Sequence, residues 1–204
     1  MLASSPVPGA QPSPGAVPPP PLQFLADCQS PAYASDVVVC GDEALLSLDR
    51  EVRRLYESLQ DALQPTADGG LLDPLVLFEP QDAWFRRRSL CAFSSHQRDC
   101  LRAAYVERLR VLRALELQRE RPSQQVVYAV CRDSPWDLGP TGVTATQLGE
   151  IVLTAPSGRV RAVAVGDLPR DDWTPYLRHQ AEGSQLRLFP LEGPVITCEL
   201  REPN

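Results

Sequence analysis

The sequence predicts an α+β fold, with a disulfide-stapled N-terminal helical domain followed by a small antiparallel β-barrel or sandwich. Three observations predict it. Six cysteines are grouped along the chain, amphipathic runs with helical spacing extend up to Pro122, and short β-branched segments follow that proline. We therefore expect a disordered proline-rich tether over 1–21, a helical domain over 22–121 and a β-rich domain over 122–204.

Three helices are expected in the helical domain, after a short loop or half-turn over 22–41. The first begins near Asp42, because a carboxylate suits a helix N-terminus, and it ends before Pro65. The second runs from Pro80 to about Leu90, and the third from about Arg98 to Glu120. The apolar stripe of the first helix comprises Leu45, Leu48, Val52, Leu55, Tyr56, Leu59 and Leu63.

The second predicted helix contains a candidate core residue and three consecutive arginines. Trp84 is expected to anchor the core, and the consecutive residues Arg86, Arg87 and Arg88 are expected on the exposed side. The apolar run 75–78 just before this helix is predicted as either a buried turn or a brief strand.

Strands are expected after Pro122. Segments rich in β-branched residues alternate there with Gly and Pro, which favours a small barrel or sandwich. The predicted strands are 126–130, 151–153, 160–165, 186–189 and 195–198.

The cysteine count is even, and no pair of CxxC motifs suggests a metal site. Disulfides, and therefore an oxidising compartment, are the better interpretation. The local pairings Cys28–Cys40, Cys91–Cys100 and Cys131–Cys198 are expected; the alternative links the two N-terminal pairs crosswise.

The chain is acidic, with a formal net charge of −6, and its basic residues are all arginine. Acidic residues dominate 22–79, with eleven against three arginines, whereas 80–121 carries ten arginines against five acids. These stretches are interpreted either as solvated helix faces or as an acidic surface that attracts a cationic partner. An overall acidic protein with acids inside its basic stretch is not expected to bind nucleic acid.

Several chemistries are not expected from this sequence. It contains no nucleophile elbow, phosphate-binding loop or HExxH helix, so we expect a protein that is not an enzyme and needs no cofactor. The two histidines, His96 and His179, have no cysteine at metal-ligand spacing, so no metal site is expected.

No apolar run is long enough for a transmembrane helix. Residues 1–21 do not resemble a signal peptide, so we expect a removed export signal, and any membrane anchor outside this chain.

Aromatic and acidic residues offer two further hypotheses, each with a simpler alternative. The three tryptophans have faces that suit sugar stacking, although core or rim packing is the alternative for Trp84, Trp136 and Trp173. Asp171 and Asp172 could suggest a carboxylate pair for glycoside chemistry. Adjacent strand residues point to opposite faces, however, so a shared catalytic geometry is not expected.

Two cysteine pairs and two helix signatures follow one another in the first domain. Cys28 and Cys40 are followed by the run Leu46 to Tyr56 (LSLDREVRRLY), and the run Trp84 to Leu109 contains the second cysteine pair. In these features the domain resembles the LprI-type lysozyme inhibitor family. The resemblance covers about residues 24–115 and includes both cysteine pairs and both helix signatures in the family's order. It implies a small disulfide-closed helical domain.

The β-rich domain combines short predicted strands, a closing Cys131–Cys198 pair and the run Ser157-Gly158-Arg159 between two strands. In this pattern it resembles the MliC-type inhibitors, whose small β-barrel carries a Ser-Gly loop that enters the lysozyme cleft. The resemblance implies that Ser157, Gly158 and Arg159 correspond to that loop, although an ordinary turn is the alternative. The family also uses a Lys before a Gly, where this chain has Ala181-Glu182-Gly183. Arg178 or Arg159 would have to replace that Lys, with a planar guanidinium instead of a compact ammonium.

These resemblances imply a secreted or periplasmic lysozyme inhibitor that occludes the enzyme's cleft. Because c-type lysozymes are cationic, an acidic inhibitor is expected to associate quickly. The alternative is an envelope protein-interaction module that does not inhibit lysozyme and binds another protein through its helical domain.

Overall fold

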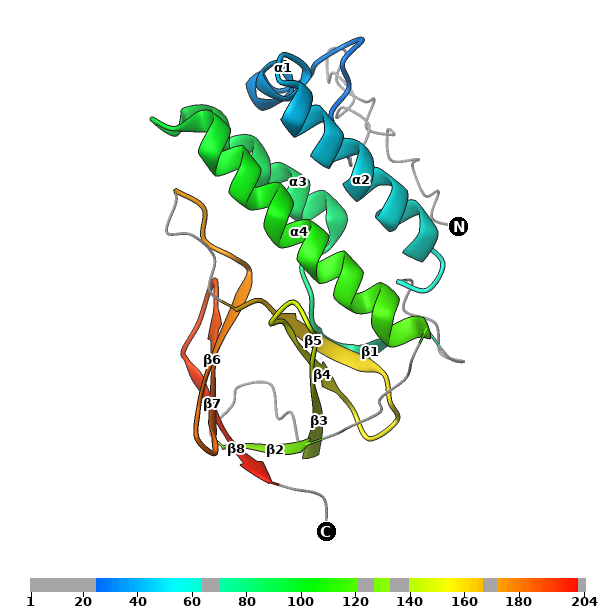
Figure 1. The fold of residues 1–204 in the computed structure, drawn as a ribbon, viewed down its shortest axis with the longest axis vertical. Coiled ribbons are helices and arrows are strands. Elements are labelled where there is room, and N and C mark those ends of the chain that lie inside the picture. Colours follow the sequence, from blue (N-terminus) through cyan, green and yellow to red (C-terminus); the bar gives the residue numbers. More distant parts are fainter. Residues whose placement is uncertain (1–24, 64–69, 121–126, 133–139, 167–171, 202–204) are drawn as a thin grey trace, which may run out of the picture.

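The computed structural model of the protein describes residues 25–63, 70–120, 127–132, 140–166 and 172–201 (Figure 1). The helices form one layer that lies against a curled β-sheet. The helical elements are α1 (Ala34–Cys40), α2 (Glu43–Leu59), α3 (Gln81–Ser89), the 3-10 helix η1 (Leu90–Phe93) and α4 (Gln97–Glu120). The strands are β1 (Leu72–Leu77), β2 (Val127–Arg132), β3 (Pro140–Ala145), β4 (Ile151–Thr154), β5 (Val160–Ala164), β6 (Leu177–Glu182), β7 (Gln185–Pro190) and β8 (Ile196–Arg201). The α+β class predicted from the sequence is confirmed.

The predicted helix start at Asp42 is confirmed. Its carboxylate accepts hydrogen bonds from the backbone N–H groups of Ala44 and Leu45, at 3.0 and 3.1 Å, and so caps α2. Helices α2 and α4 lie side by side and run in the same direction (Figure 1). Polar contacts along their length join Asp42 to Arg98 (3.6 Å), Glu51 to Arg113 (2.5 Å) and the Ser58 carbonyl to Arg119 (2.7 Å).

The strands form one eight-stranded sheet in the order β1-β5-β4-β3-β2-β8-β7-β6. Neighbours are antiparallel except for β1, which pairs with β5 in parallel. The sheet curls into a half-barrel, and Val165, directly after β5, exchanges backbone hydrogen bonds of 3.0 Å with Leu177 and His179 of β6. The apolar run at 75–78, left open between a turn and a strand, contributes to β1. The predicted helical domain thus supplies one edge strand of the sheet.

The three disulfides are Cys28–Cys40, Cys91–Cys100 and Cys131–Cys198. The predicted local pairing is therefore confirmed, and the crosswise alternative is not adopted. The first bridge ties the segment before α1 to the end of α1, the second ties η1 to α4, and the third links directly opposed residues of β2 and β8. Such a disulfide set is typical of secreted proteins.

Within the described residues, none of the helices combines the length and the apolar character needed to span a bilayer.

Two clusters of buried apolar residues hold the fold together. One lies inside the curl of the sheet, around Leu153, Leu186 and Leu188. The other lies beneath the helices and includes Val152 and Val163 of the sheet together with residues of α2, α3 and α4. The helices and the sheet therefore bury apolar surface against each other. The domain boundary at 121/122 stays a prediction, and the expected tether over 1–21 lies outside the described residues.

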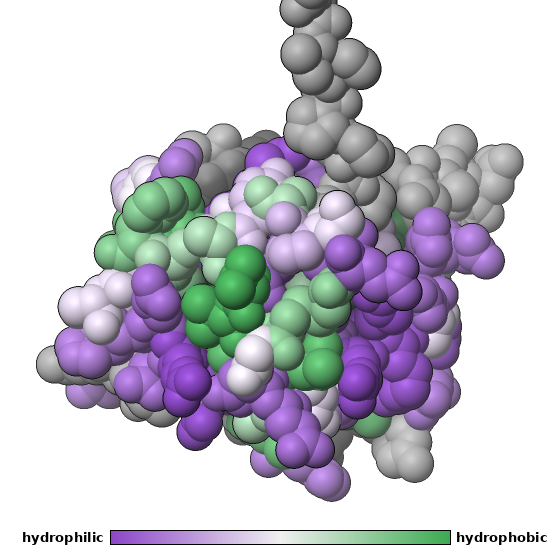
Figure 2. Space-filling model, turned by 90° about the horizontal axis from the view of Figure 1, so that it is seen from above, coloured by the Kyte–Doolittle hydropathy of each residue, from purple (hydrophilic) through white to green (hydrophobic). Residues whose placement is uncertain are grey.

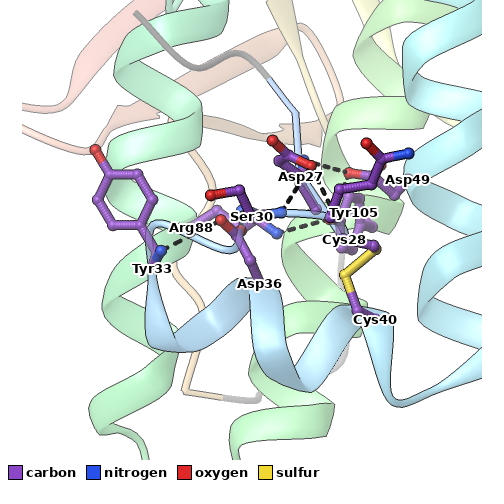
Figure 3. Close-up of a disulfide and its surroundings, with 11 residues drawn as sticks. Asp27, Cys28, Ser30, Tyr33, Asp36, Cys40, Asp49, Arg88 and Tyr105 are labelled. Carbon is purple, nitrogen blue, oxygen red and sulfur yellow. Dashed lines mark hydrogen bonds and ion pairs between the residues drawn. A yellow bond between two sulfur atoms is a disulfide. The ribbon is translucent and has the colours of Figure 1, made fainter. Parts of the chain in front are cut away.

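A buried polar network lies beneath α1, beside the first disulfide (Figure 3). The guanidinium of Arg88 donates to Asp36 and to the Tyr105 hydroxyl, each at 2.7 Å. The Tyr105 hydroxyl in turn donates to Asp49 at 2.8 Å. The side chains of Arg88 and Asp36 are completely buried, so this ion pair joins α1 to α3 away from water. Tyr105 and Asp49 extend the network to α4 and α2.

The expectation that Arg86, Arg87 and Arg88 lie on the exposed side of their helix is wrong. The side chain of Arg86 is 57% exposed, but that of Arg87 is only 16% exposed and that of Arg88 is fully buried. Consecutive helical residues point about 100° apart, so three in a row cannot share one face. The expectation that Trp84 is a core residue is confirmed, because it is fully buried.

Several elements differ from the sequence-based expectations, among them α1, β3 and β6. The stretch that was predicted as a loop contains the helix α1. This helix forms even though its central valines are weak helix formers. The Cys28–Cys40 bridge and the Asp36–Arg88 pair hold this helix in place. β3 was not predicted because Pro140 and Gly142 suggested a break. The residue pattern of β6 did not predict a strand because it is mostly polar.

Substituting Asp36 with Ala should destabilise the protein by about 3–5 kcal/mol, because it leaves the Arg88 charge buried without its carboxylate. Chemical denaturation monitored by circular dichroism would measure the free energy of unfolding. Asp82→Ala is the matched control: it removes the exposed i,i+4 partner of Arg86 and should cost less than about 1 kcal/mol. Equal losses for the two variants would contradict this role of the buried pair.

Candidate functional site

The residues predicted to form an inhibitory loop, Ser157, Gly158 and Arg159, lie together in the tight turn between β4 and β5. The backbone of Ala155 makes hydrogen bonds with Arg159 (2.8 Å) and with Gly158 (2.9 Å) across the turn. Gly158 has a φ of 81°, which favours glycine. Ser157 and Gly158 are exposed, so the turn presents a narrow tip to solvent. Its proposed role stays a prediction.

Of the two arginines considered as replacements for the missing Lys, only Arg159 lies in this turn. Arg178 is bridged to Val165, at the opposite end of β5, and its guanidinium lies 5.5 Å from the centre of the Phe189 ring. Ala181-Glu182-Gly183 lies at the end of β6 and in the turn that follows. The structure therefore does not bring Arg178 to Ser157.

A separate concave site lies where the helices meet the sheet, and we call it the junction cleft. It has a volume of about 410 Å³. Its lining comes from α3, η1, the start of α4, the segment before β6 and the segment after β7. The lining residues are Arg87, Leu90, Cys91, Phe93, Ser94, Cys100, Asp172, Trp173, Thr174 and Leu191.

Large apolar side chains are exposed along the rim of the junction cleft and beside it. Phe93 is 86% exposed and Leu90 is 61% exposed, although both belong to η1, which the Cys91–Cys100 disulfide links to α4. Val37 of α1, which packs against η1, is 60% exposed. Figure 2, viewed from the α1 end of the molecule, shows apolar side chains gathered on this face. Exposed apolar residues grouped in this way mark interaction surfaces.

Glu107 of α4 holds one wall of the cleft in position. Its carboxylate accepts hydrogen bonds from the indole Nε1 of Trp173 at 2.5 Å and from the backbone N–H of Tyr176 at 2.7 Å. Arg87 donates to both carboxylate oxygens of Glu79, at 2.7 and 2.6 Å, and lies 3.4 Å from Glu107. The segment before β6 is thereby attached to α3 and α4.

Burial shifts the pKa values of two groups in this cluster. The side chain of Glu107 is only 3% exposed, and burial raises its pKa above the ordinary value although the Arg87 charge opposes the shift. Burial also lowers the pKa of Arg108 to about 10. Arg108 donates to Gln81 at 2.8 Å and to the Glu79 carbonyl at 2.9 Å.

At the rim, Asp172 is paired with two polar residues of the segment before α4. The Ser94 hydroxyl donates a short hydrogen bond to the Asp172 carboxylate, and His96 Nδ1 lies 3.7 Å from it. The hydrogen bond from Ser94 lowers the pKa of Asp172. Ser94 contacts the aspartate rather than the imidazole. Ser95 does contact the imidazole, at 3.1 Å, but at Nδ1, the same nitrogen that faces Asp172. This is not the order of contacts in a catalytic triad.

The sugar-stacking hypothesis does not fit the two tryptophans that the structure describes. Trp84 is fully buried, and Trp173 is only 6% exposed. The guanidinium of Arg87 also covers the Trp173 ring at 3.9 Å from its centre. Trp136 and Asp171 lie outside the described residues. Among the residues that are described, no group of three His, Cys, Asp or Glu side chains is placed to hold a metal ion.

No family model, no curated protein and no solved structure matches this chain. The site must therefore be judged on its own geometry.

Sequence reasoning did not find the junction cleft. Its lining residues are spread from Arg87 to Leu191 and form no motif. One signal was present, because Leu90 and Phe93 flank a cysteine in a short cysteine-closed loop that has too few residues to bury them.

Glu107→Gln tests the effect of burial on this carboxylate. An acid whose pKa is raised by folding contributes most to stability below its unfolded pKa and loses that contribution as the pH rises through the folded value. The unfolding free energy of the unmodified protein, relative to that of Glu107→Gln, should therefore increase from about pH 8 to about pH 5. Thermal or urea unfolding at each pH measures this difference. Glu199→Gln, on an exposed pair, is the surface control; a difference that shrinks towards acid pH would contradict the assignment.

Proposed function

We propose that this protein is a secreted, periplasmic or cell-envelope inhibitor that binds a lysozyme and occludes its cleft, without catalysing a reaction itself. The observation that carries the proposal is the Ser157–Gly158–Arg159 turn, a narrow exposed tip on a hairpin that belongs to the curled sheet. A rigid protruding tip of this kind suits insertion into a concave enzyme site, because little conformational freedom is lost on binding.

Two properties of the chain support this proposal. The disulfides favour an oxidising compartment such as the periplasm or the extracellular space, where lysozymes act. The net charge of −6 favours rapid association with a cationic lysozyme. The resemblance to LprI-type and MliC-type inhibitors points to the same partner, with Arg159 as the cation nearest the tip.

The second candidate function is an envelope protein-interaction module that does not inhibit lysozyme. The 86% exposure of Phe93 beside the junction cleft favours it, since an apolar side chain so exposed is explained by a partner that covers it. The two candidates use different surfaces of the molecule, so they can be tested separately.

A lysis assay on a cell-wall suspension tests the first candidate. Purified protein should delay lysis by a c-type lysozyme, and the association rate should fall as salt is added. Ser157→Trp should weaken inhibition about tenfold or more, because a bulky side chain prevents the tip from entering a cleft. Ser184→Trp, in the turn between β6 and β7, is the matched control and should inhibit like the unmodified protein.

Absence of inhibition at concentrations on the order of tens of micromolar, against c-type and other lysozymes alike, would reject the first candidate. Equal weakening by Ser157→Trp and Ser184→Trp would instead reject the turn as the inhibitory element.

A further inference from the structure

We propose that the junction cleft is a docking site for a cationic amphipathic segment of a partner protein. Apolar side chains of that segment would fill the cleft, and a neighbouring Lys or Arg would meet Asp172. The proposal names the partner chemistry for the interaction-module function and rests on that function, but it does not depend on inhibition of lysozyme. None of the residues of the Ser157–Arg159 turn lines the cleft.

The size and lining of the cleft suit side chains of a protein segment. Its volume of about 410 Å³ lies within the range of ligand sites and can hold several side chains. Leu90, Phe93 and Leu191 provide apolar surface that a binding segment would remove from water. An aromatic side chain that a partner covers fully is typical of the anchor residues that carry most of the binding free energy of an interface.

The platform is rigid before any partner arrives. The disulfide between Cys91 and Cys100 joins η1 to the first turn of α4, and both cysteines line the cleft. On the opposite wall, Trp173 is held by its hydrogen bond to Glu107 and by the guanidinium of Arg87. A partner would therefore bind a preformed surface, which reduces the entropic cost of association.

The charges in the cleft favour a cation. Arg87 donates to both carboxylate oxygens of Glu79 and lies close to Glu107, so its charge is already paired within the protein. Asp172 is 45% exposed at the rim, and the hydrogen bond from Ser94 favours its ionised form.

Binding of three fluorescently labelled synthetic helices tests this proposal with the full chain. One helix has a Leu face and an Arg face, the second has Leu and Glu faces, and the third has Ser and Arg faces. Only the Leu/Arg helix should bind, measured by fluorescence anisotropy. The double variant Leu90→Ser/Phe93→Ser should weaken its binding about tenfold or more, and Asp172→Asn should weaken it less but reduce its salt dependence. Leu148→Ser, at another exposed leucine, should leave it unchanged.

The outcomes separate the alternatives. Equal binding of the Leu/Glu helix would overturn the charge assignment, and equal binding of the Ser/Arg helix would overturn the apolar one. Binding that survives the double variant, or self-association of the chain that the double variant abolishes, would overturn the cleft as a site for a different protein.

Because Leu90 and Phe93 are exposed, the variants should fold, and unchanged melting temperatures would verify this. Lysis inhibition by the same double variant should match that of the unmodified protein, which keeps this test distinct from that of the Ser157 turn.

Discussion

The carboxylate of Glu107 is a buried polar contact that joins the helices to the segment just before β6. It lies on α4, and it accepts hydrogen bonds from the side chain of Trp173 and the backbone of Tyr176 just before β6. A buried carboxylate is tolerated only when it is paired, and Arg87 of α3 supplies that partner. One side chain thus fixes the relative position of two helices and one segment of the β-rich part. The wall of the junction cleft depends on this arrangement.

A second buried ion pair, Asp36 with Arg88, organises the other side of the helical layer. Arg87 and Arg88 are neighbours on α3, but they point in different directions, one towards the sheet and one towards α1 and Tyr105. The third arginine of the run, Arg86, stays at the surface. Guanidinium groups suit both buried positions because each donates in several directions at once. The helical layer is therefore held by polar contacts as well as by its apolar core.

Two of the disulfides stabilise parts of the fold that have little core of their own. α1 has seven residues and η1 has four, and each is tied by one bridge. Short elements of this size cannot stay ordered through helix propensity alone. Because η1 is held in this way, Leu90 and Phe93 remain exposed on a rigid support. The same constraint that stabilises the helical layer thus creates the apolar rim of the cleft.

The sequence by itself determined the class of the fold, the α2 cap at Asp42 and the buried position of Trp84, because these depend on local spacing and residue type. It favoured the observed cysteine pairing but left a crosswise alternative, which the structure decided. It did not reveal α1, because valines disfavour a helix. It did not reveal β3 and β6 from their residue patterns either, because Pro, Gly and polar residues are uncommon in strands. These two strands are defined by pairing with their neighbours. Only the tertiary structure decided which of three consecutive arginines is buried, and only it assembled the junction cleft. The physical reason is the same in each case: burial and ion pairing join residues from Asp36 to Trp173, and no local pattern encodes a contact between segments so far apart in the chain.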